Sequence, residues 1–242
     1  MKNITNLLNP FTESKFKYFK TPWGEIIPTV DIFPIIYLIF IYGFIYILPY
    51  GRNFIGVSWF DWFRTEDGPL EWLQFIFFLG TFVCSSIILW LTRSRKEKKE
   101  RRTWLGFACL SLFVAGEEIS WGERLTGFGF DVLRNLNEQG ESNIHNSEFF
   151  HHTLLDPSII CLCLFLGWIC WRLWPNIEAF PKKYYSLYFL PVALFYFYYD
   201  ISYASTIKQI RYDGEIFELL ISIGLLSHCW NNMRKILKGT NS

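Results

Sequence analysis

The feature that most constrains this chain is the grouping of its apolar residues into blocks of about twenty, separated by short charged segments. A bilayer has a hydrocarbon core about 30 Å thick, and each helical span needs roughly 20 apolar residues to cross it. Of the 242 residues, 51% are hydrophobic, so such blocks can recur along the whole chain. The sequence therefore predicts an all-α, polytopic integral membrane protein with about six transmembrane helices, near residues 31–50, 70–92, 103–125, 157–174, 184–203 and 215–233.

The spans are expected to form a single membrane domain, residues 1–242, because no linker rich in proline, glycine or serine separates them. The polar and aromatic N-terminal segment, residues 1–30, is predicted to stay on the protein, because no small-residue cleavage site follows the first apolar block. The formal net charge is +1 and the basic residues lie at span ends, a pattern that excludes nucleic acid as a partner. The lipid bilayer is the predicted partner.

Lysine and arginine in short loops predict the orientation of the spans. Seven basic residues and two acids occupy the link 93–102, and further basic residues lie in the N-terminal segment, before span five and after span six. By contrast, the long loop 126–156 carries five acids against Arg134 alone. This asymmetry predicts that both termini are cytoplasmic and that the loop 126–156 lies on the outer face.

The stretch GEEISWGER, residues 116–124, places three carboxylates and an arginine at the outer end of the third span. At about 1.5 Å of rise per residue, Glu117 and Glu118 lie roughly 21 Å along this span, at the depth where Glu71 and Glu218 begin their descent from the outer face. Ionisable side chains at such depth are costly unless they are paired or face a wet cavity. We therefore interpret these four carboxylates as candidate catalytic residues of an outward-opening pocket.

A second interpretation of the same stretch is purely structural. On a continuous helix, Glu117 shares a face with Trp121 and Arg124, whereas Glu118 and Arg124 are too far apart to form a pair. An ion pair between Arg124 and either Glu117 or Glu123 would then only fix helix packing. The sequence leaves both interpretations open.

The outer loop adds a group of candidate metal ligands in NEQGESNIHNSEFFHHTLLDP, residues 137–157. Neutral imidazole and carboxylate bind zinc or iron, and a catalytic site uses about three protein ligands and one open position. The candidates are Glu141, His145, His151 and His152. Their spacing matches no H-E-x-x-H motif, and the alternative is that the histidines form hydrogen bonds at the membrane surface.

Three blocks of the chain carry a resemblance: EDGPLEWL at 66–73, GEEISWGER at 116–124 and NEQGESNIHN at 137–146. They resemble a group of uncharacterised bacterial multi-pass membrane proteins that carry similar blocks in this order. In that group GEE-x-SWG is usually followed by glutamine, whereas this chain has Glu123. The resemblance covers spans two to four and implies a bacterial inner membrane location, but it implies no activity.

The chain is also similar in part to CAAX-type intramembrane proteases, which carry a Glu-Glu pair, an arginine, an isolated histidine and a final His-x3-Asn. The matching residues here are Glu117, Glu118, Arg124, His151, His228 and Asn232. The arginine comes two residues later than in their pattern. His228 is predicted about 15 Å deeper than Glu218, so it could hardly share a site with the glutamate pair.

A further partial similarity is to alkaline ceramidase-like membrane hydrolases, which bind zinc through membrane-embedded histidines. Ser147-x3-His151 is similar to one of their motifs. Their final pair of histidines on one helix has no counterpart, because His228 stands alone in its span.

These observations predict a metal-dependent, membrane-embedded hydrolase or transferase that acts on a lipid or a lipid-linked substrate. Glu117 or Glu118 would be the general base, and the loop histidines with Glu141 would bind a divalent metal, zinc or iron, or orient the water. The alternative is a non-enzymatic protein: a cation or proton pathway, or an accessory subunit that binds a partner protein or a second copy. Few polar side chains occupy the inner halves of the spans, which argues against a through-channel; they are His228, Ser85, Ser86 and Ser227.

Overall fold

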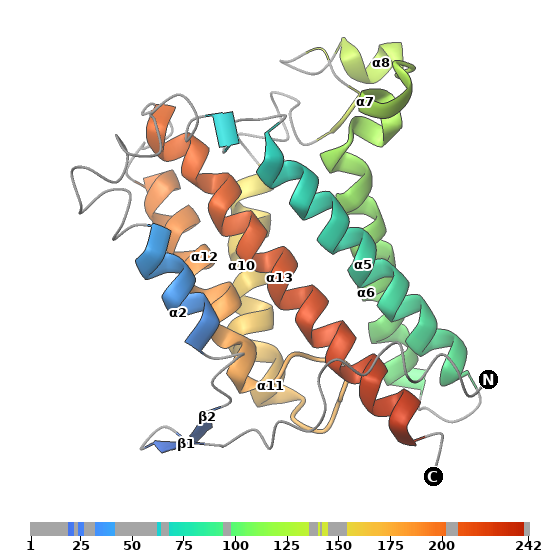
Figure 1. Cartoon of the computed structure of the whole chain (residues 1–242), viewed down its shortest axis with the longest axis vertical. Helices are drawn as coiled ribbons and strands as arrows, with labels where there is room; N and C mark the ends of the chain where they lie inside the picture. The colour runs from blue at the N-terminus through green and yellow to red at the C-terminus, as the bar shows by residue number, and fades with distance from the viewer. Residues whose placement is uncertain are drawn as a thin grey trace.

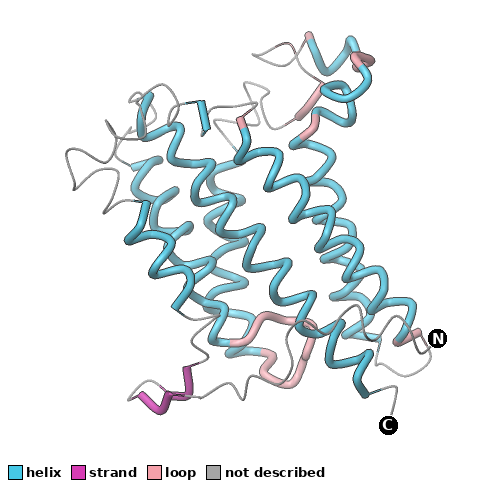
Figure 2. The backbone as a smooth tube through the Cα atoms, in the orientation of Figure 1, coloured by secondary structure: helices cyan, strands magenta, loops and turns pink. Residues whose placement is uncertain are grey.

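The computed structural model of the chain (Figure 1) describes residues 19–21, 24–26, 32–41, 62–63, 68–93, 98–135, 140, 142–144, 154–201 and 208–239. Within these residues the protein is all-α apart from one hairpin, in which β1 (Phe19–Thr21) pairs antiparallel with β2 (Gly24–Ile26). The tube in Figure 2 shows that helices make up nearly all of the described chain. The predicted all-α fold is confirmed for these residues.

The helices follow the order in which the apolar blocks occur. They are α2 (Phe33–Leu38), α5 (Pro69–Leu91), α6 (Lys98–Glu118), η3 (Ser120–Gly122), α7 (Glu123–Thr126), α8 (Asp131–Arg134), α10 (Asp156–Leu164), η5 (Phe165–Ile169), α11 (Cys170–Leu173), η6 (Lys183–Tyr185), α12 (Ser186–Ile201) and α13 (Lys208–Gly239). The π-helical turn η5 joins α10 to α11, so Asp156–Leu173 forms one helical run.

The helix α13 lies at the centre of the bundle (Figure 1). It packs against α5 on one side and α12 on the other, while α6 packs against α5 and α10 packs against α12. We call the end that holds α7, α8 and the start of α5 the outer end. The inner end holds the end of α5, the start of α6 and the last turns of α13 (Figure 1).

Three predicted spans coincide with helices to within two residues: 70–92 with α5, 157–174 with α10 through α11, and 184–203 with α12. Among the described residues, two helices have the length and apolar composition that a membrane crossing requires, Pro69–Leu91 and Asp156–Leu173.

The other three predicted spans differ from the helices at their ends. The helix α13 extends beyond 215–233 in both directions, and α2 occupies the first part of 31–50, whose residues from 42 onward lie outside the described chain. The prediction of a continuous helix over 103–125 is wrong, because α6 already begins at Lys98 and ends at Glu118. The backbone turns at that point into η3.

The helix α5 carries both polar and apolar side chains on its buried face and large apolar side chains on its exposed face. Its buried polar residues are Glu71, Gln74, Thr81 and Ser85. Its exposed large apolar residues are Trp72, Ile76, Leu79, Val83 and Trp90. Its buried apolar residues are Leu70, Phe78, Cys84 and Ile88. Both faces of α5 therefore carry apolar side chains, whereas a helix on the surface of a water-soluble protein exposes a polar face.

Candidate functional site

The candidate site begins where α6 ends, at three residues with a left-handed backbone. Ser120, Trp121 and Gly122 have φ values of 47°, 54° and 91°. Glycine adopts this conformation freely, but a residue with a Cβ atom incurs a cost of about 1–2 kcal/mol. The segment ends α6 at Glu118, and α7 begins only after it, at Glu123.

Side-chain contacts with the last turns of α6 hold the strained turn in place. The Trp121 ring folds back over Gly116, where a Cβ atom would lie 2.9 Å from the ring. Its indole Nε1 donates a hydrogen bond to Glu117 Oε1 at 2.5 Å, and the ring meets Phe113 edge-on with centroids 5.8 Å apart. Glycine at position 116 is therefore required for the close approach of the ring.

Two of the three carboxylates in GEEISWGER anchor a segment of the outer loop. Glu117 Oε2 accepts from the backbone N–H of Ile144 at 2.7 Å, and Glu123 Oε2 accepts from the backbone N–H of Ser142 at 2.7 Å. Between them, Asn143 Nδ2 donates to Ser120 Oγ at 3.1 Å. Both Glu117 oxygens accept hydrogen bonds, which gives this carboxylate a structural task.

Glu123 lies on α7, beyond the end of α6, and forms an ion pair with Arg134 on α8. Arg134 Nε donates to Glu123 Oε1 at 2.7 Å, and Arg134 Nη2 donates to the same oxygen. The hydrogen bonds from Arg134 and then those from Ser142 lower the pKa of Glu123 below its ordinary value. Glu123 and Arg134 thus tie α7, α8 and the loop segment together.

Arg124 connects this turn to α5. Its Nη1 atom forms an ion pair with Glu71 Oε2 and donates to the backbone carbonyl of Glu118 at 2.9 Å. The sequence predicted that Arg124 and Glu118 are too far apart to form a pair, and the contact of Arg124 is with the backbone carbonyl of Glu118 and not with its carboxylate.

Four carboxylates from three helices lie close together at the outer end, and we call them the carboxylate cluster: Glu71, Glu118, Glu215 and Glu218. Glu118 interacts electrostatically with Glu218, Glu71, Arg124 and Glu117, and Glu215 interacts with the other three members of the cluster. The structure therefore brings together three of the four predicted catalytic residues, with Glu117 beside them. Among the described residues, Arg124 supplies the guanidinium that these acids face.

Three members of the carboxylate cluster have their own hydrogen-bond donor. Arg124 donates to Glu71, Tyr196 OH donates to Glu218, and Gln74 Nε2 donates to Glu215 Oε2 at 2.9 Å. Among the described residues, none donates to the side-chain oxygens of Glu118, although Glu118 is buried. Glu118 is thus the carboxyl group of the cluster for which the described residues supply no donor.

Sequence reasoning missed three members of this site: Glu215, Gln74 and Tyr196. The first two had a detectable signal, because Glu215 precedes Glu218 by one turn and Gln74 follows Glu71 by one turn. Residues at that spacing share a helix face. Tyr196 gave no such signal, because tyrosines are frequent along α12.

The four predicted metal ligands, Glu141, His145, His151 and His152, lie outside the described residues. Within the described chain, no group of three or more His, Cys, Asp or Glu side chains is arranged to hold a metal ion. The metal site therefore stays a prediction.

His228 lies at the inner end, away from the carboxylate cluster. It is stacked on Trp104 near the start of α6, with ring centroids 5.6 Å apart, and its Nε2 atom lies 2.9 Å from the carbonyl oxygen of Ala179. Asn232 Nδ2 lies 3.2 Å from His228 Nδ1, so the His-x3-Asn pair is formed. Trp104 precedes Glu117 by thirteen residues of one helix, about 20 Å, which separates this pair from the glutamates.

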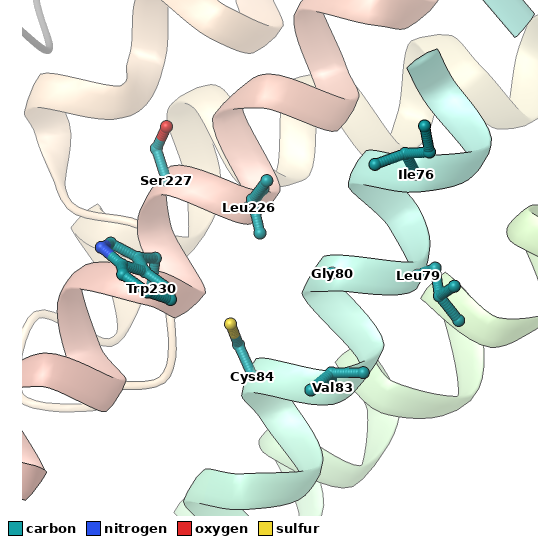
Figure 3. A pocket seen from close by; sticks show the side chains of 8 residues that line it. All are labelled: Ile76, Leu79, Gly80, Val83, Cys84, Leu226, Ser227 and Trp230. Atoms are coloured by element: carbon teal, nitrogen blue, oxygen red, sulfur yellow. The ribbon is translucent and has the colours of Figure 1, made fainter. Parts of the chain in front are cut away.

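A groove of about 580 Å³ lies between α5 and α13 (Figure 3). It is lined by Ile76, Leu79, Gly80, Val83, Cys84, Leu226, Ser227 and Trp230. No carboxylate of the cluster lines it, and most of its lining is apolar. The groove therefore belongs to the apolar exterior of the bundle.

Comparisons with protein-family models, with curated proteins and with solved structures find no match for this chain. The three sequence blocks that carry the resemblance are nevertheless in contact with one another. Glu71 of EDGPLEWL pairs with Arg124 of GEEISWGER, and Ile144 of NEQGESNIHN donates to Glu117. The function must therefore be inferred from the site itself.

Proposed function

We propose that the protein is a six-span integral membrane protein of the bacterial inner membrane with both termini in the cytoplasm. The exposed apolar surface of α5 supports a lipid surrounding, since water-soluble proteins rarely expose apolar patches of this extent. Trp72 and Trp90 are exposed near opposite ends of α5, about 27 Å apart along the helix, close to the thickness of a hydrocarbon core. Tryptophans at both interfaces are typical of membrane spans.

The distribution of charge supports the orientation. The basic residues of the first turns of α6, of the segment before α12 and of the last turns of α13 all lie at the inner end, which would be cytoplasmic. The carboxylate cluster would then lie near the outer face.

We infer that the carboxylate cluster is the acid–base centre of a membrane-embedded hydrolase or transferase that acts on a lipid or a lipid-linked substrate. The observation that carries this proposal is the Glu118 carboxyl, which is buried among other acids and receives no hydrogen bond from the described residues. Glu118 would act as the general base. Arg124 would hold Glu71 and the end of α6 in position, and Glu218 would be oriented by Tyr196.

The support for a divalent metal in this proposal comes from the sequence alone. Glu141 precedes Ser142 and His145 follows Ile144, and these two neighbours are anchored on Glu123 and Glu117. Zinc or iron bound by the loop would polarise the scissile group or activate a water.

The test uses purified protein in vesicles of phosphatidylethanolamine and phosphatidylglycerol, supplied with a total bacterial lipid extract. Lipid products are followed by mass spectrometry. Glu118→Gln should lower product formation by about 100-fold or more, the typical contribution of a general base. Glu117→Gln is the matched control. Product formation per folded molecule of this variant should match that of the wild-type protein. Unchanged lipids with the wild-type protein, or full turnover by Glu118→Gln, would overturn the proposal.

A second candidate function, the reversible binding of protons or another cation, is favoured by the charge of the cluster. Within the described residues, the cluster holds two buried and two half-buried carboxylates beside the guanidinium of Arg124, so its negative charge calls for a compensating cation or proton. In addition, the Gln74 Oε1 atom is buried and has no hydrogen-bond partner among the described residues, so it could accept from a protonated carboxyl.

Infrared spectroscopy tests this second candidate without a substrate. The wild-type protein at neutral pH should show the carbonyl band of a protonated carboxyl group. The band should shrink in Glu118→Gln or Glu215→Gln and persist in Glu117→Gln. A spectrum without that band, in buffers of any monovalent or divalent cation, would contradict proton storage at the cluster.

A further inference from the structure

The two short helices at the outer end carry large apolar side chains that no other part of the described chain covers. We call residues 123–134, which hold α7 and α8, the outer cap. Leu125, Phe128, Phe130 and Val132 are 62%, 85%, 62% and 73% exposed. A water-facing surface seldom concentrates apolar side chains in this way.

The other side of the outer cap is polar and is fixed to the bundle. Glu123 accepts from Arg134 and from the backbone of Ser142, and the backbone N–H of Phe130 donates to Ser142 Oγ at 2.5 Å. Arg124 pairs with Glu71. Because these contacts use the polar side, the apolar side of the cap is held outward and cannot turn into the bundle.

The ion pair also sets the depth of the outer cap. Glu71 lies in the first turn of α5, next to the exposed Trp72, at the level where hydrocarbon would give way to headgroups. The exposed ring of Trp121 packs on Phe113, which is itself exposed on the outward surface of α6. The apolar exterior of α6 therefore extends through Phe113 to Trp121, two residues before the cap begins.

We propose that the outer cap is a membrane-interface segment that inserts Leu125, Phe128, Phe130 and Val132 into the boundary between headgroups and acyl chains of the outer leaflet. Interfacial segments bind in this way, with an apolar face sunk several ångströms below the headgroups and a polar face above. The inference rests on the proposed membrane placement. It adds that phospholipid, rather than a protein, covers the cap and lies beside the carboxylate cluster, where a lipid-linked substrate would enter.

The experiment places p-benzoylphenylalanine at single positions of the full chain in vesicles of phosphatidylethanolamine and phosphatidylglycerol. After illumination, the mass of the protein reports lipid adducts. Labels at positions 128 and 132 test whether lipid covers the cap. A label at position 112, where Leu112 lies on the outward surface of α6, tests whether the bundle lies in the membrane at all. Asp131 is the matched control, because it lies between the apolar positions and its side chain is 89% exposed.

Lipid adducts at Phe128 and Val132 should approach those at Leu112 and exceed those at Asp131 by about tenfold, as expected for side chains that reach the acyl boundary. Adducts at Leu112 without adducts at Phe128 would overturn the inference and leave the membrane placement intact. Crosslinks from Phe128 to a second copy of the chain would also overturn it. The absence of adducts at Leu112 as well would instead reject the membrane placement.

Discussion

The Nη1 atom of Arg124 on α7 contacts both Oε2 of Glu71 on α5 and the backbone carbonyl oxygen of Glu118 at the end of α6. One guanidinium thereby joins two helices that come from different predicted spans. Both side chains of the ion pair are largely buried, with 10% and 4% of their surfaces exposed. The energetic role of this pair determines how firmly the outer end of the bundle is held.

Removing the cation of this pair should destabilise the protein strongly. Arg124→Met leaves the Glu71 carboxylate buried without its partner, so the free energy of unfolding should fall by about 3–5 kcal/mol. The double variant Arg124→Met with Glu71→Leu should recover most of that loss, because it leaves no uncompensated charge. Unfolding in mixed micelles, followed by circular dichroism, measures both. Equal losses in the single and double variants would show that the pair contributes little beyond packing.

Two glycines of α6 should respond to alanine in opposite directions. The added methyl group of Gly116→Ala would lie 2.9 Å from the Trp121 ring, so the strained turn must shift at a cost of about 1–3 kcal/mol. In Gly106→Ala the methyl group meets nothing within 4 Å, and the higher helix propensity of alanine should stabilise the protein by about 0.5–1 kcal/mol. Thermal unfolding should show a lower midpoint for Gly116→Ala and a higher midpoint for Gly106→Ala. An increase in both variants would refute the packing of Trp121 on Gly116.

The anchored loop segment should loosen in acid. Because the pKa of Glu123 is lowered in the folded protein, the stabilisation from its ionised form is fully present above the ordinary value of 4.5 and is lost as pH falls through the lowered pKa. Hydrogen exchange at the Ser142 amide, corrected for its intrinsic rate, should stay slow at neutral pH and accelerate only below about pH 4.5. Glu123→Ala should make this amide exchange fast at every pH. Asp131→Ala, which removes only the 3.4 Å contact of an exposed carboxylate with Arg134, should not.

The helical architecture could be predicted because membrane spans obey a length rule that a single sequence displays. The same counting placed Glu71, Glu118 and Glu218 at one depth, and the structure does bring these three side chains together. The same reasoning could have predicted Glu215 and Gln74, because each lies one helical turn from a predicted site residue.

The end of α6 could not be predicted from apolar periodicity, because it depends on how individual side chains pack and pair. Trp121 has a left-handed backbone, its ring packs over Gly116, and its indole nitrogen donates to Glu117. The different tasks of Glu117 and Glu118 were hidden for the same reason. Glu117 receives a backbone N–H from Ile144, twenty-seven residues away, and no helix periodicity predicts that contact.

The adjacent acids Glu117 and Glu118 should therefore affect stability with opposite signs. Glu117→Gln places an amide NH2 group against the N–H of either Trp121 or Ile144, so the free energy of unfolding should fall by about 1–3 kcal/mol. Glu118→Gln removes a buried acid that receives no hydrogen bond from the described residues and faces Glu218 and Glu71, so it should raise the free energy of unfolding by about 0.5–2 kcal/mol. A site kept for chemistry is expected to carry such a destabilising group. Urea or detergent unfolding of both variants decides the matter, and a loss of stability in Glu118→Gln as large as that in Glu117→Gln would make Glu118 one more structural anchor.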